Sequence, residues 1–401
     1  MTGVLITVPS GALGSEGVSS STRIAGLPLL LRIVLAATHA GFGRILIHPA
    51  AVSDDGSAIA GTAATVLPRD GRLPTLPRGR IVLLATNVLP QVKWLRSLLE
   101  IPIEPERLYA DGSAVAVIET GTPDRVLAEA ARCDGAPALF ESLREAYKTA
   151  DRSFGGEGRF PLATPRAVPK AEAWLLGGLI KEAEGFMSRH VERRISLALT
   201  RRLATTRITP NVMTVVSLVV GLLGVPFFLS QRPAYQLTGA LLLLSHSILD
   251  GCDGELARLK FQESRLGSLL DFWGDNVVHV AVMAGIAIGW SLAVQAAWPL
   301  LIGGVAAASV LLTATLVYRL TRHGTTVAGA LFPSGSGPRP SWLSRMADML
   351  ARRDFIYLVV LLSALGKATW FLALAAVGTP VFLLALTWIA RAERQRREVR
   401  A

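Results

Sequence analysis

The sequence predicts two halves of different fold class: an N-terminal α/β domain and a C-terminal all-α integral membrane domain of six transmembrane helices. Three observations favour this division. Apolar residues make up 51% of the 401 residues and charged residues only 18%, whereas soluble domains carry about 25% charged residues. Long apolar stretches occur only after about residue 212. Before about residue 170, short apolar runs alternate with Gly, Pro and charged residues.

The composition excludes several protein classes and leaves three kinds of partner. Glycine follows no triplet period, and the two cysteines, Cys133 and Cys252, are too few for a disulfide framework. The high apolar content excludes a disordered chain. The net charge of +11 leaves nucleic acid, anionic lipid and phosphorylated substrates as possible partners.

The N-terminal domain is expected to contain buried parallel strands. Short apolar runs at Val4–Val8, 45–48 and 81–86 are bounded by Gly, Pro or polar residues, as is typical of such strands. An apolar helical pattern covers about 27–39 and ends before Gly41. A strand, a helix and a second strand in this order predict a βαβ unit.

The membrane domain is predicted over residues 173–401, after an N-terminal domain of residues 1–150 and a Gly- and Pro-rich linker of residues 151–172. A hydrocarbon core about 30 Å thick needs about 20 mostly apolar residues in a helix. One such stretch is also consistent with a core helix of a soluble protein, but a succession of them favours a membrane. Six stretches are found, at about 212–230, 235–250, 269–290, 294–318, 354–371 and 373–390.

Lys and Arg residues concentrate in alternate loops and predict the orientation of the helices. The segment before the first stretch, the second-to-third loop, the fourth-to-fifth loop and the C-terminal tail are basic. Because basic loops stay in the cytoplasm, both ends of a multi-pass protein are expected there, with the plasma membrane of a prokaryote as its location. No N-terminal signal sequence is expected, because residues 1–30 lack a basic region followed by a long apolar run. Juxtamembrane arginines facing membrane lipids account for the charge, and no nucleic-acid partner is expected because no binding motif supports one.

Acidic residues are rare in the membrane half, and four of them cluster. Asp250 and Asp253 are spaced i, i+3 at the end of the second stretch, while Gly267, Asp271 and Asp275 are spaced i, i+4, i+8 at the start of the third. Each set lies on one helical face. Unpaired carboxylates at this depth mark a functional site. All-oxygen ligands suit Mg²⁺ or Mn²⁺, and four carboxylates can hold two ions about 3.5–4 Å apart.

Small residues accompany these carboxylates. Gly254 and Ala257 follow the first pair around its face, and Gly267 lies one turn before the second. Their missing side chains leave a groove for a nucleotide, where Arg258 can clamp a phosphate. The alternative is a solvated loop in which the acids pair with nearby basic residues, which explains one or two carboxylates but not four.

The aspartates and the small residues between them form a pattern that resembles the signature of a known family. The pattern D-x2-D-G-x2-A-R-x8-G-x3-D-x3-D, from Asp250 to Asp275, resembles the signature of the CDP-alcohol phosphotransferases, also called CDP-alcohol phosphatidyltransferases, which are membrane enzymes with six transmembrane helices. The resemblance covers about residues 185–395. Residues 208–214 are similar to the family's TPNxxT entry to the first helix, and the amphipathic segment 191–203 is similar to its juxtamembrane helix.

The resemblance implies a metal-dependent transfer and a homodimer. Asp275 would be the general base, taking the proton from an acceptor hydroxyl whose oxygen attacks the β-phosphorus of a CDP-alcohol and releases CMP. The metal ligands, for two Mg²⁺ or Mn²⁺ ions, would be Asp250, Asp253, Asp271 and Asp275. The CDP pocket would be formed by Asn211, Thr214, Gly254, Ala257, Arg258 and Gly267.

The N-terminal half resembles a Rossmann-like nucleotidyltransferase domain in its order of strand, Gly-rich loop, helix and strand. Fusion of the two domains is similar to the bifunctional inositol-phosphate cytidylyltransferase/di-myo-inositol-phosphate-phosphate synthases. The chain departs from the nucleotidyltransferase pattern, since its loop has no arginine before Arg23, no lysine stands beside Pro28, and Asn87 takes the place of a metal-binding aspartate. We therefore expect this domain to be degenerate and not catalytic, with a regulatory or assembly role as the alternative.

Several questions stay open at the level of the sequence. The acceptor is either an alcohol of the phospholipid type or an inositol phosphate. His279 can hydrogen-bond Asp275 or pack in the core, and the basic residues of 319–353 can bind an acceptor phosphate or anchor the helices. Two other functions compete: an aspartate- and Mg²⁺-dependent membrane prenyltransferase, and a non-enzymatic membrane transporter or scaffold.

Overall fold

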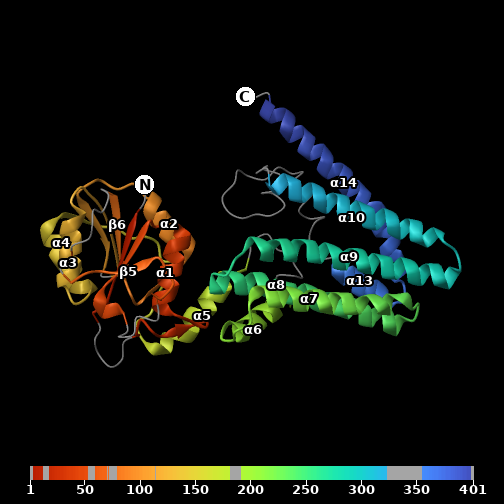
Figure 1. The fold of residues 1–401 in the computed structure, drawn as a ribbon, viewed down its shortest axis with the longest axis horizontal. Coiled ribbons are helices and arrows are strands. Elements are labelled where there is room, and N and C mark those ends of the chain that lie inside the picture. The colour runs from red at the N-terminus through yellow and green to blue at the C-terminus, as the bar shows by residue number, and fades with distance from the viewer. Residues whose placement is uncertain are drawn as a thin grey trace. The chain divides into compact units, whose positions relative to one another are not determined.

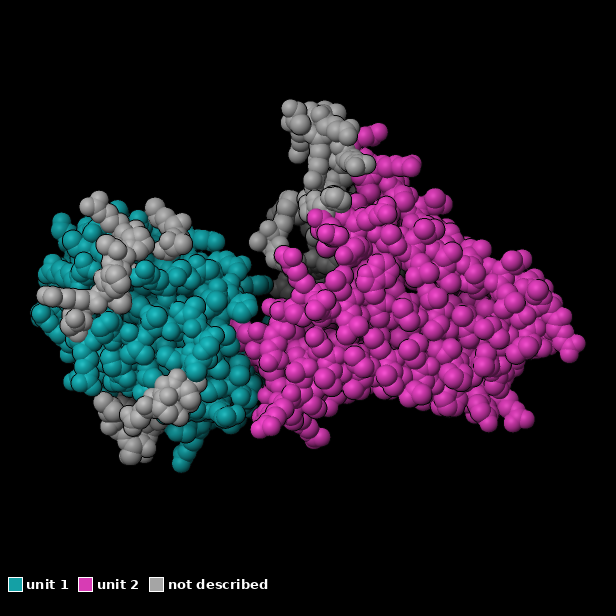
Figure 2. Space-filling model, in the orientation of Figure 1, with its two compact units in different colours: residues 1–178 teal, residues 179–401 magenta. Residues whose placement is uncertain are grey.

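The computed structural model describes residues 3–11, 18–52, 59–69, 71, 79–112, 114–180, 191–322 and 355–398. The chain divides into two compact units, Met1–Gly178 (unit 1) and Leu179–Ala401 (unit 2), which Figure 2 colours separately. Unit 1 is a mixed α/β sheet domain and unit 2 is helical. The predicted pair of fold classes is therefore confirmed at this level.

Unit 1 is organised around a seven-stranded sheet. All its neighbouring strands are parallel except for the two pairs that β9 makes, so β1, β4, β6, β8 and β10 have their carboxyl ends at one edge. From one side to the other the strands are β10 (Lys148–Asp151), β8 (Arg107–Asp111), β9 (Val115–Thr120), β6 (Gly79–Ala85), β1 (Val4–Val8), β4 (Arg44–Ile47) and β5 (Ala64–Val66).

Helices cover both faces of this sheet. In Figure 1, α1 packs with α2 on one face, and α3 packs with α4 on the other. This explains why β1 and β6 are apolar almost throughout, since both faces of each strand are buried. The helices are α1 (Leu29–Ala40), α2 (Val92–Glu100), α3 (Pro123–Arg132) and α4 (Ala136–Ala146).

The predicted elements of unit 1 differ from the observed ones by a few residues at their ends. The predicted strands 45–48 and 81–86 are β4 and β6, and the predicted helix 27–39 is α1. Gly41 ends α1 in the left-handed conformation, with φ +99°, which glycine adopts at low cost. The Gly-rich loop of the predicted nucleotide site lies mostly outside the described residues, because 12–17 are not among them.

The segment 151–172, predicted as a linker, contains regular structure and belongs to unit 1. β11 (Arg159–Pro161) pairs with β7 (Val88–Pro90), and α5 (Val168–Gly177) begins in the same segment. Glu172 of α5 accepts a hydrogen bond from the backbone N–H of Ala25 at 2.8 Å. The Gly and Pro residues that suggested a linker separate these short elements from one another.

A buried arginine fixes the same turn from the other side. Ala25 and Gly26 form the turn of a hairpin between β2 (Arg23–Ile24) and β3 (Leu27–Pro28). Arg32 of α1 donates to the backbone oxygens of Ile24 (2.7 Å) and Ala25 (2.8 Å). Burial lowers the pKa of Arg32 to about 10, and the charge of Glu172 opposes this shift. α1, the hairpin and α5 are thus held together by polar contacts.

Unit 2 is built from long helices that pack side by side in Figure 1. α8 contacts α6, α7 and α13; α9 contacts α7 and α10; and α10 contacts α14. The elements are α6 (Arg193–Ala204), α7 (Pro210–Gly224), the 3₁₀ turn η5 (Val225–Leu229), α8 (Pro233–Lys260), α9 (Arg265–Val294), α10 (Trp298–Arg322), α13 (Phe355–Ala364) and α14 (Ala368–Glu398).

Four helical segments among the described residues are long and apolar enough to cross a membrane. They are Pro210–Leu229, Arg265–Val294, Trp298–Arg322 and Ala368–Arg391. Large apolar side chains are exposed along them, as with Leu301 (72% exposed) and Leu384 (68%), which is the surface expected toward lipid rather than water. The protein is a multi-pass integral membrane protein.

Local signals in the sequence explain where the helices of the site begin and end. Thr209 caps α7 by accepting a hydrogen bond from the N–H of Val212 at 3.4 Å, with Pro210 in the first turn. Ser264 caps α9 by accepting from the N–H of Gly267 at 3.0 Å. Phe261 ends α8 in the left-handed conformation. Only a short turn therefore separates the end of α8 from the start of α9.

Candidate metal centre

Three aspartates converge from α8 and α9. One carboxylate oxygen from each of Asp250, Asp271 and Asp275 lies within 4.8 Å of the others. Asp250 is buried, and Asp271 and Asp275 are half-buried. Three ionised carboxylates this close repel one another, and a divalent cation is the simplest compensation. The donor set consists of oxygens alone, which fits Mg²⁺ or Mn²⁺ better than zinc.

Asp253 lies beside this cluster and is tied to a neighbouring helix. It is buried, and its carboxylate accepts a short hydrogen bond from the hydroxyl of Thr214 on α7. The group of three converging carboxylates does not include it. The structure thus joins a residue expected to bind metal to one expected to contact the nucleotide.

The small residues of the motif leave room for polar side chains. A Cβ atom at Gly267 would lie 2.8 Å from Oδ1 of Asn211, so the Asn211 side chain occupies the space that glycine leaves. A Cβ atom at Gly254 would lie 3.3 Å from Nη1 of Arg258. Ala257 is half-buried, one turn after Asp253 on α8. The predicted nucleotide-contacting residues therefore line the helix ends next to the aspartates.

A buried histidine that the sequence analysis did not single out contacts the cluster. Nε2 of His246 on α8 lies 3.3 Å from Oδ1 of Asp275. Its Nδ1 lies 2.9 Å from the backbone oxygen of Ser217 on α7. The sequence carries one signal that could have pointed to this histidine: His246 precedes Asp250 by four residues and therefore shares its helical face. His279, the histidine that the sequence suggested, packs edge-on against Phe355 with ring centroids 5.4 Å apart.

A buried carboxylate within the motif has a different role. Glu255 is fully buried and accepts hydrogen bonds from Nη1 of Arg193, Oγ of Ser196 and Oγ1 of Thr200, each at 2.7 Å. All three donors belong to α6. The amphipathic helix is therefore fixed to α8 beside Gly254, which the sequence did not predict because the three donors lie more than fifty residues earlier.

Lys260 joins the end of α8 to the entry of α7. Its ammonium donates to the backbone oxygens of Thr206 (2.8 Å) and Ile208 (2.9 Å). These residues directly precede the Thr209–Asn211 entry. Of the basic residues considered for an acceptor phosphate, His323, Arg352 and Arg353 lie outside the described residues.

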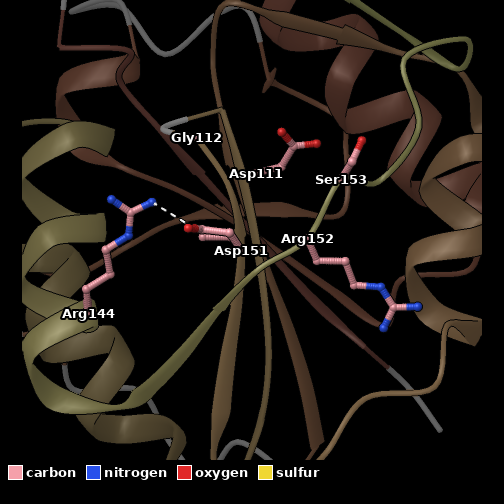
Figure 3. Close-up of a pocket in the computed structure, with 7 residues that line it drawn as sticks. Asp111, Gly112, Arg144, Asp151, Arg152 and Ser153 are labelled. Carbon is pink, nitrogen blue, oxygen red and sulfur yellow. Dashed lines mark ion pairs between the residues drawn. The ribbon is translucent and has the colours of Figure 1, made fainter.

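Unit 1 has a polar pocket of its own, at the carboxyl ends of β8 and β10 (Figure 3). Its volume is about 410 Å³. Charged side chains at its wall already have partners in the protein: Arg144 pairs with Asp151 at 3.6 Å, and Asp111 accepts from Arg159 and from the N–H of Phe154. The pocket is lined by Ala110, Asp111, Gly112, Arg144, Asp151, Arg152 and Ser153.

A family model and several curated proteins match the chain. The model described as CDP-alcohol phosphatidyltransferase matches residues 207–335. A bifunctional IPC transferase and DIPP synthase of Rubrobacter xylanophilus is 31% identical over 338 residues, covering 71% of this chain and 76% of that protein. This coverage exceeds unit 2, so the match extends into unit 1.

Two further relatives match shorter regions. A bifunctional IPC transferase and DIPP synthase of Thermococcus kodakarensis is 38% identical over 133 residues, which are 33% of this chain and 30% of that protein. A CDP-diacylglycerol–serine O-phosphatidyltransferase of Mycobacterium bovis is 28% identical over 190 residues, covering 46% of this chain and 61% of that protein.

Proposed function

This chain belongs to the CDP-alcohol phosphatidyltransferase family, and on that premise we propose that it moves the phospho-alcohol group of a CDP-alcohol to an acceptor hydroxyl and releases CMP. The observation that carries the proposal is the convergence of Asp250, Asp271 and Asp275 within 4.8 Å. The reaction needs a cation at the pyrophosphate and a base at the acceptor hydroxyl, and this cluster can provide for both.

Asp275 is the proposed general base. One of its carboxylate oxygens takes the proton of the acceptor hydroxyl, whose oxygen forms a bond to the β-phosphorus of the CDP-alcohol. The bond between that phosphorus and the bridging oxygen breaks, and CMP leaves with the bridging oxygen. Bound Mg²⁺ or Mn²⁺, in our proposal two ions held by Asp250, Asp253, Asp271 and Asp275, would neutralise the pyrophosphate oxygens during this step.

The CDP moiety is proposed to bind where α7, α8 and α9 meet. The approach of Asn211 to Gly267 and the hydrogen bond from Thr214 to Asp253 support this placement. Arg258, whose guanidinium lies next to Gly254, is suited to hold a phosphate oxygen. The residues proposed to contact CDP are Asn211, Thr214, Gly254, Ala257, Arg258 and Gly267.

Six transmembrane helices are proposed, formed by the four long apolar segments together with α8 and α13. α8 has 28 residues, and the first half of it is apolar while the charged motif occupies the second half. The aspartates therefore lie toward the end of α8 whose Glu255 is hydrogen-bonded to the basic helix α6. Because basic segments stay in the cytoplasm, we place the active site and unit 1 on the cytoplasmic side of a prokaryotic plasma membrane, in a homodimer.

Unit 1 is proposed to be a degenerate nucleotidyltransferase domain without catalytic activity. Thr86 and Asn87 follow β6, where the resemblance requires a metal-binding carboxylate. The carboxylates of the pocket, Asp111 and Asp151, are paired with arginines. A CDP-alcohol made by another enzyme would then be the donor.

An inositol-phosphate-like acceptor is the favoured substrate class. The Rubrobacter relative, named for IPC transferase and DIPP synthase activity, matches both units of this chain. A phospholipid product is the second candidate, favoured by the match to a CDP-diacylglycerol–serine O-phosphatidyltransferase over part of the chain.

The test is a CMP-release screen of the purified full-length protein with Mg²⁺. CDP-inositol and CDP-diacylglycerol are each paired with inositol, inositol phosphate, glycerol phosphate and serine, and the product mass is measured. We expect CMP with one pair, and loss of at least about 100-fold in Asp275→Asn. Full activity of that variant contradicts the assignment of the base. Release of pyrophosphate from a prenyl diphosphate would favour a prenyltransferase, and no metal-dependent nucleotide binding would favour a transporter or scaffold.

A further inference from the structure

We propose that Lys260, the last residue of α8, is a positioning residue that fixes the entry to α7 and with it the side chain of Asn211. The inference rests on the proposed function, in which Asn211 contacts CDP. Nζ of Lys260 donates to the backbone oxygens of Thr206 (2.8 Å) and Ile208 (2.9 Å). Both residues lie in the loop 205–209, which joins α6 to α7. One side chain of α8 therefore holds this loop at two points.

The other contacts of the loop do not set its distance from α8. All its residues are exposed except Ile208, which packs against an apolar cluster of α7 and α8. The hydroxyl of Thr206 accepts from the N–H of Ile208 at 3.3 Å and donates to the backbone oxygen of Leu203 at 2.8 Å, so it ties the loop to itself and to α6. Apolar burial has no preferred direction, whereas the two hydrogen bonds from one ammonium group fix the position of the loop.

The position of the loop determines the position of the first turn of α7. Thr209 caps this helix directly after Ile208, and Pro210 follows in the first turn. Because the ring of a proline fixes its φ angle, the chain has little freedom between the loop and Asn211. Oδ1 of Asn211 lies 2.8 Å from the position of a Cβ atom at Gly267 on α9. A shift of the loop would therefore move the Asn211 amide away from α9 and from the proposed CDP pocket.

The end of α8 is itself fixed and supports this contact. Phe261 ends the helix in the left-handed conformation, and the backbone N–H of Gln262 donates to the oxygen of Ala257 at 2.8 Å, as in a closed helix terminus. Arg258, which is proposed to hold a phosphate oxygen, lies two residues before Lys260. The same helix end therefore carries one group for the phosphate and one for the loop, and it sets the distance between Arg258 and the entry to α7.

Two variants of Lys260 and one control separate this role from others. Lys260→Met keeps an unbranched apolar stem of similar length but removes the ammonium group. Lys260→Arg keeps the positive charge and has N–H donors for both carbonyl oxygens. Lys367→Met is the matched control, because Lys367 is an exposed lysine in the turn between α13 and α14, where its ammonium lies 4.8 Å from the ring centroid of Trp370. It has no part in the proposed site.

The experiment measures CMP release and hydrogen–deuterium exchange of the full-length protein in detergent. We expect Lys260→Met to raise KM for the CDP-alcohol by about tenfold with kcat within about twofold, because it weakens binding and leaves the metal ligands and the base in place. Exchange should become faster over 206–213. Lys260→Arg should keep KM within about threefold and the exchange unchanged, and Lys367→Met should change neither. Elution from size exclusion and the melting temperature establish that the variants are folded.

An unchanged KM in Lys260→Met overturns the proposal. A raised KM without faster exchange over 206–213 also overturns it, because the charge of Lys260 would then act on the anionic nucleotide directly. If the unchanged protein releases no CMP with any substrate pair, the proposed function fails instead, and binding of CMP in the presence of Mn²⁺ decides the role of Lys260. Weaker binding in Lys260→Met that Lys260→Arg restores supports this role, whereas equal binding, or no binding by the unchanged protein, contradicts it.

Discussion

Oδ1 of Asn211 lies 2.8 Å from the position that a Cβ atom would take at Gly267. The Asn211 side chain, from the first turn of α7, therefore occupies the space that Gly267 leaves on the first turn of α9. These two turns carry residues of the proposed CDP pocket, and their approach brings both beside the aspartate cluster.

Gly267→Ala is expected to raise KM for the CDP-alcohol by about tenfold with a smaller change in kcat, because the new methyl group displaces the Asn211 amide, a loss on the scale of one hydrogen bond. CMP release over a range of donor concentrations measures this. Gly304→Ala on α10 is the matched control, since a Cβ atom there meets nothing within 4 Å. An unchanged KM in Gly267→Ala would contradict the placement of the pocket.

Thr214→Val is expected to lower kcat/KM by about tenfold or more, because it removes a hydroxyl that donates to the buried carboxylate of Asp253; a hydrogen bond to a charged group contributes about 1.5–3 kcal/mol. Thr214→Ser keeps the hydroxyl and should retain most of the activity. Equal activities of the two variants would contradict the role of the hydroxyl, because only Thr214→Ser keeps it.

Glu255→Ala is expected to destabilise unit 2 by about 3 kcal/mol, because it leaves Arg193 and two buried hydroxyls without their shared acceptor. Faster hydrogen–deuterium exchange should appear first in α6. Glu263→Ala, an exposed change in the turn after α8, serves as the control. Unchanged exchange in α6 would mean that apolar packing alone holds this helix.

His48 is expected to make unit 1 less stable in acid. Burial lowers the pKa of its imidazole below the usual 6.5, opposed by the charge of Asp134. Its Nδ1 also accepts a hydrogen bond from the N–H of Ala50, which a protonated nitrogen cannot do. The unfolded chain thus binds this proton more readily, so the stabilisation is complete above pH 6.5 and falls as the pH drops below it.

Hydrogen–deuterium exchange of residues 44–51 at pH 7.5 and 5.5, corrected for the intrinsic rates, measures this loss. His48→Asn keeps an acceptor suited to the N-cap position but does not titrate, so its stability should depend less on pH over this interval. The same pH dependence in the variant would assign the effect to another group.

The parts of the site that follow from helical spacing were predictable from the sequence. Asp250, Asp271 and Asp275 converge because their spacing places them on the facing sides of two helices joined by a short turn. His246 and Glu255 were not singled out, because the roles of both depend on partners on other helices. Spacing along one helix carries no information about Ser217 or Arg193.

The same distinction applies to unit 1. The central strands β1, β4 and β6 were predicted because burial on both faces makes them continuously apolar. The edge strand β10 is only half-buried and polar, with the sequence Lys-Thr-Ala-Asp. Its composition gave no strand signal, so a linker was predicted to begin at its last residue. β10 is a strand because it pairs with β8, which lies about forty residues earlier in the chain.

Because Glu255 accepts three hydrogen bonds from α6, the residues of α6 that donate them and the residue at position 255 of α8 depend on each other. A chimera that replaces α6 by the helix of a relative without changing residue 255 would bury a carboxylate whose donors have gone. An exchange of residue 255 alone would remove the carboxylate to which Arg193, Ser196 and Thr200 donate. Substitutions at these positions are therefore expected to be tolerated together and rejected singly, although neither residue touches the reacting groups.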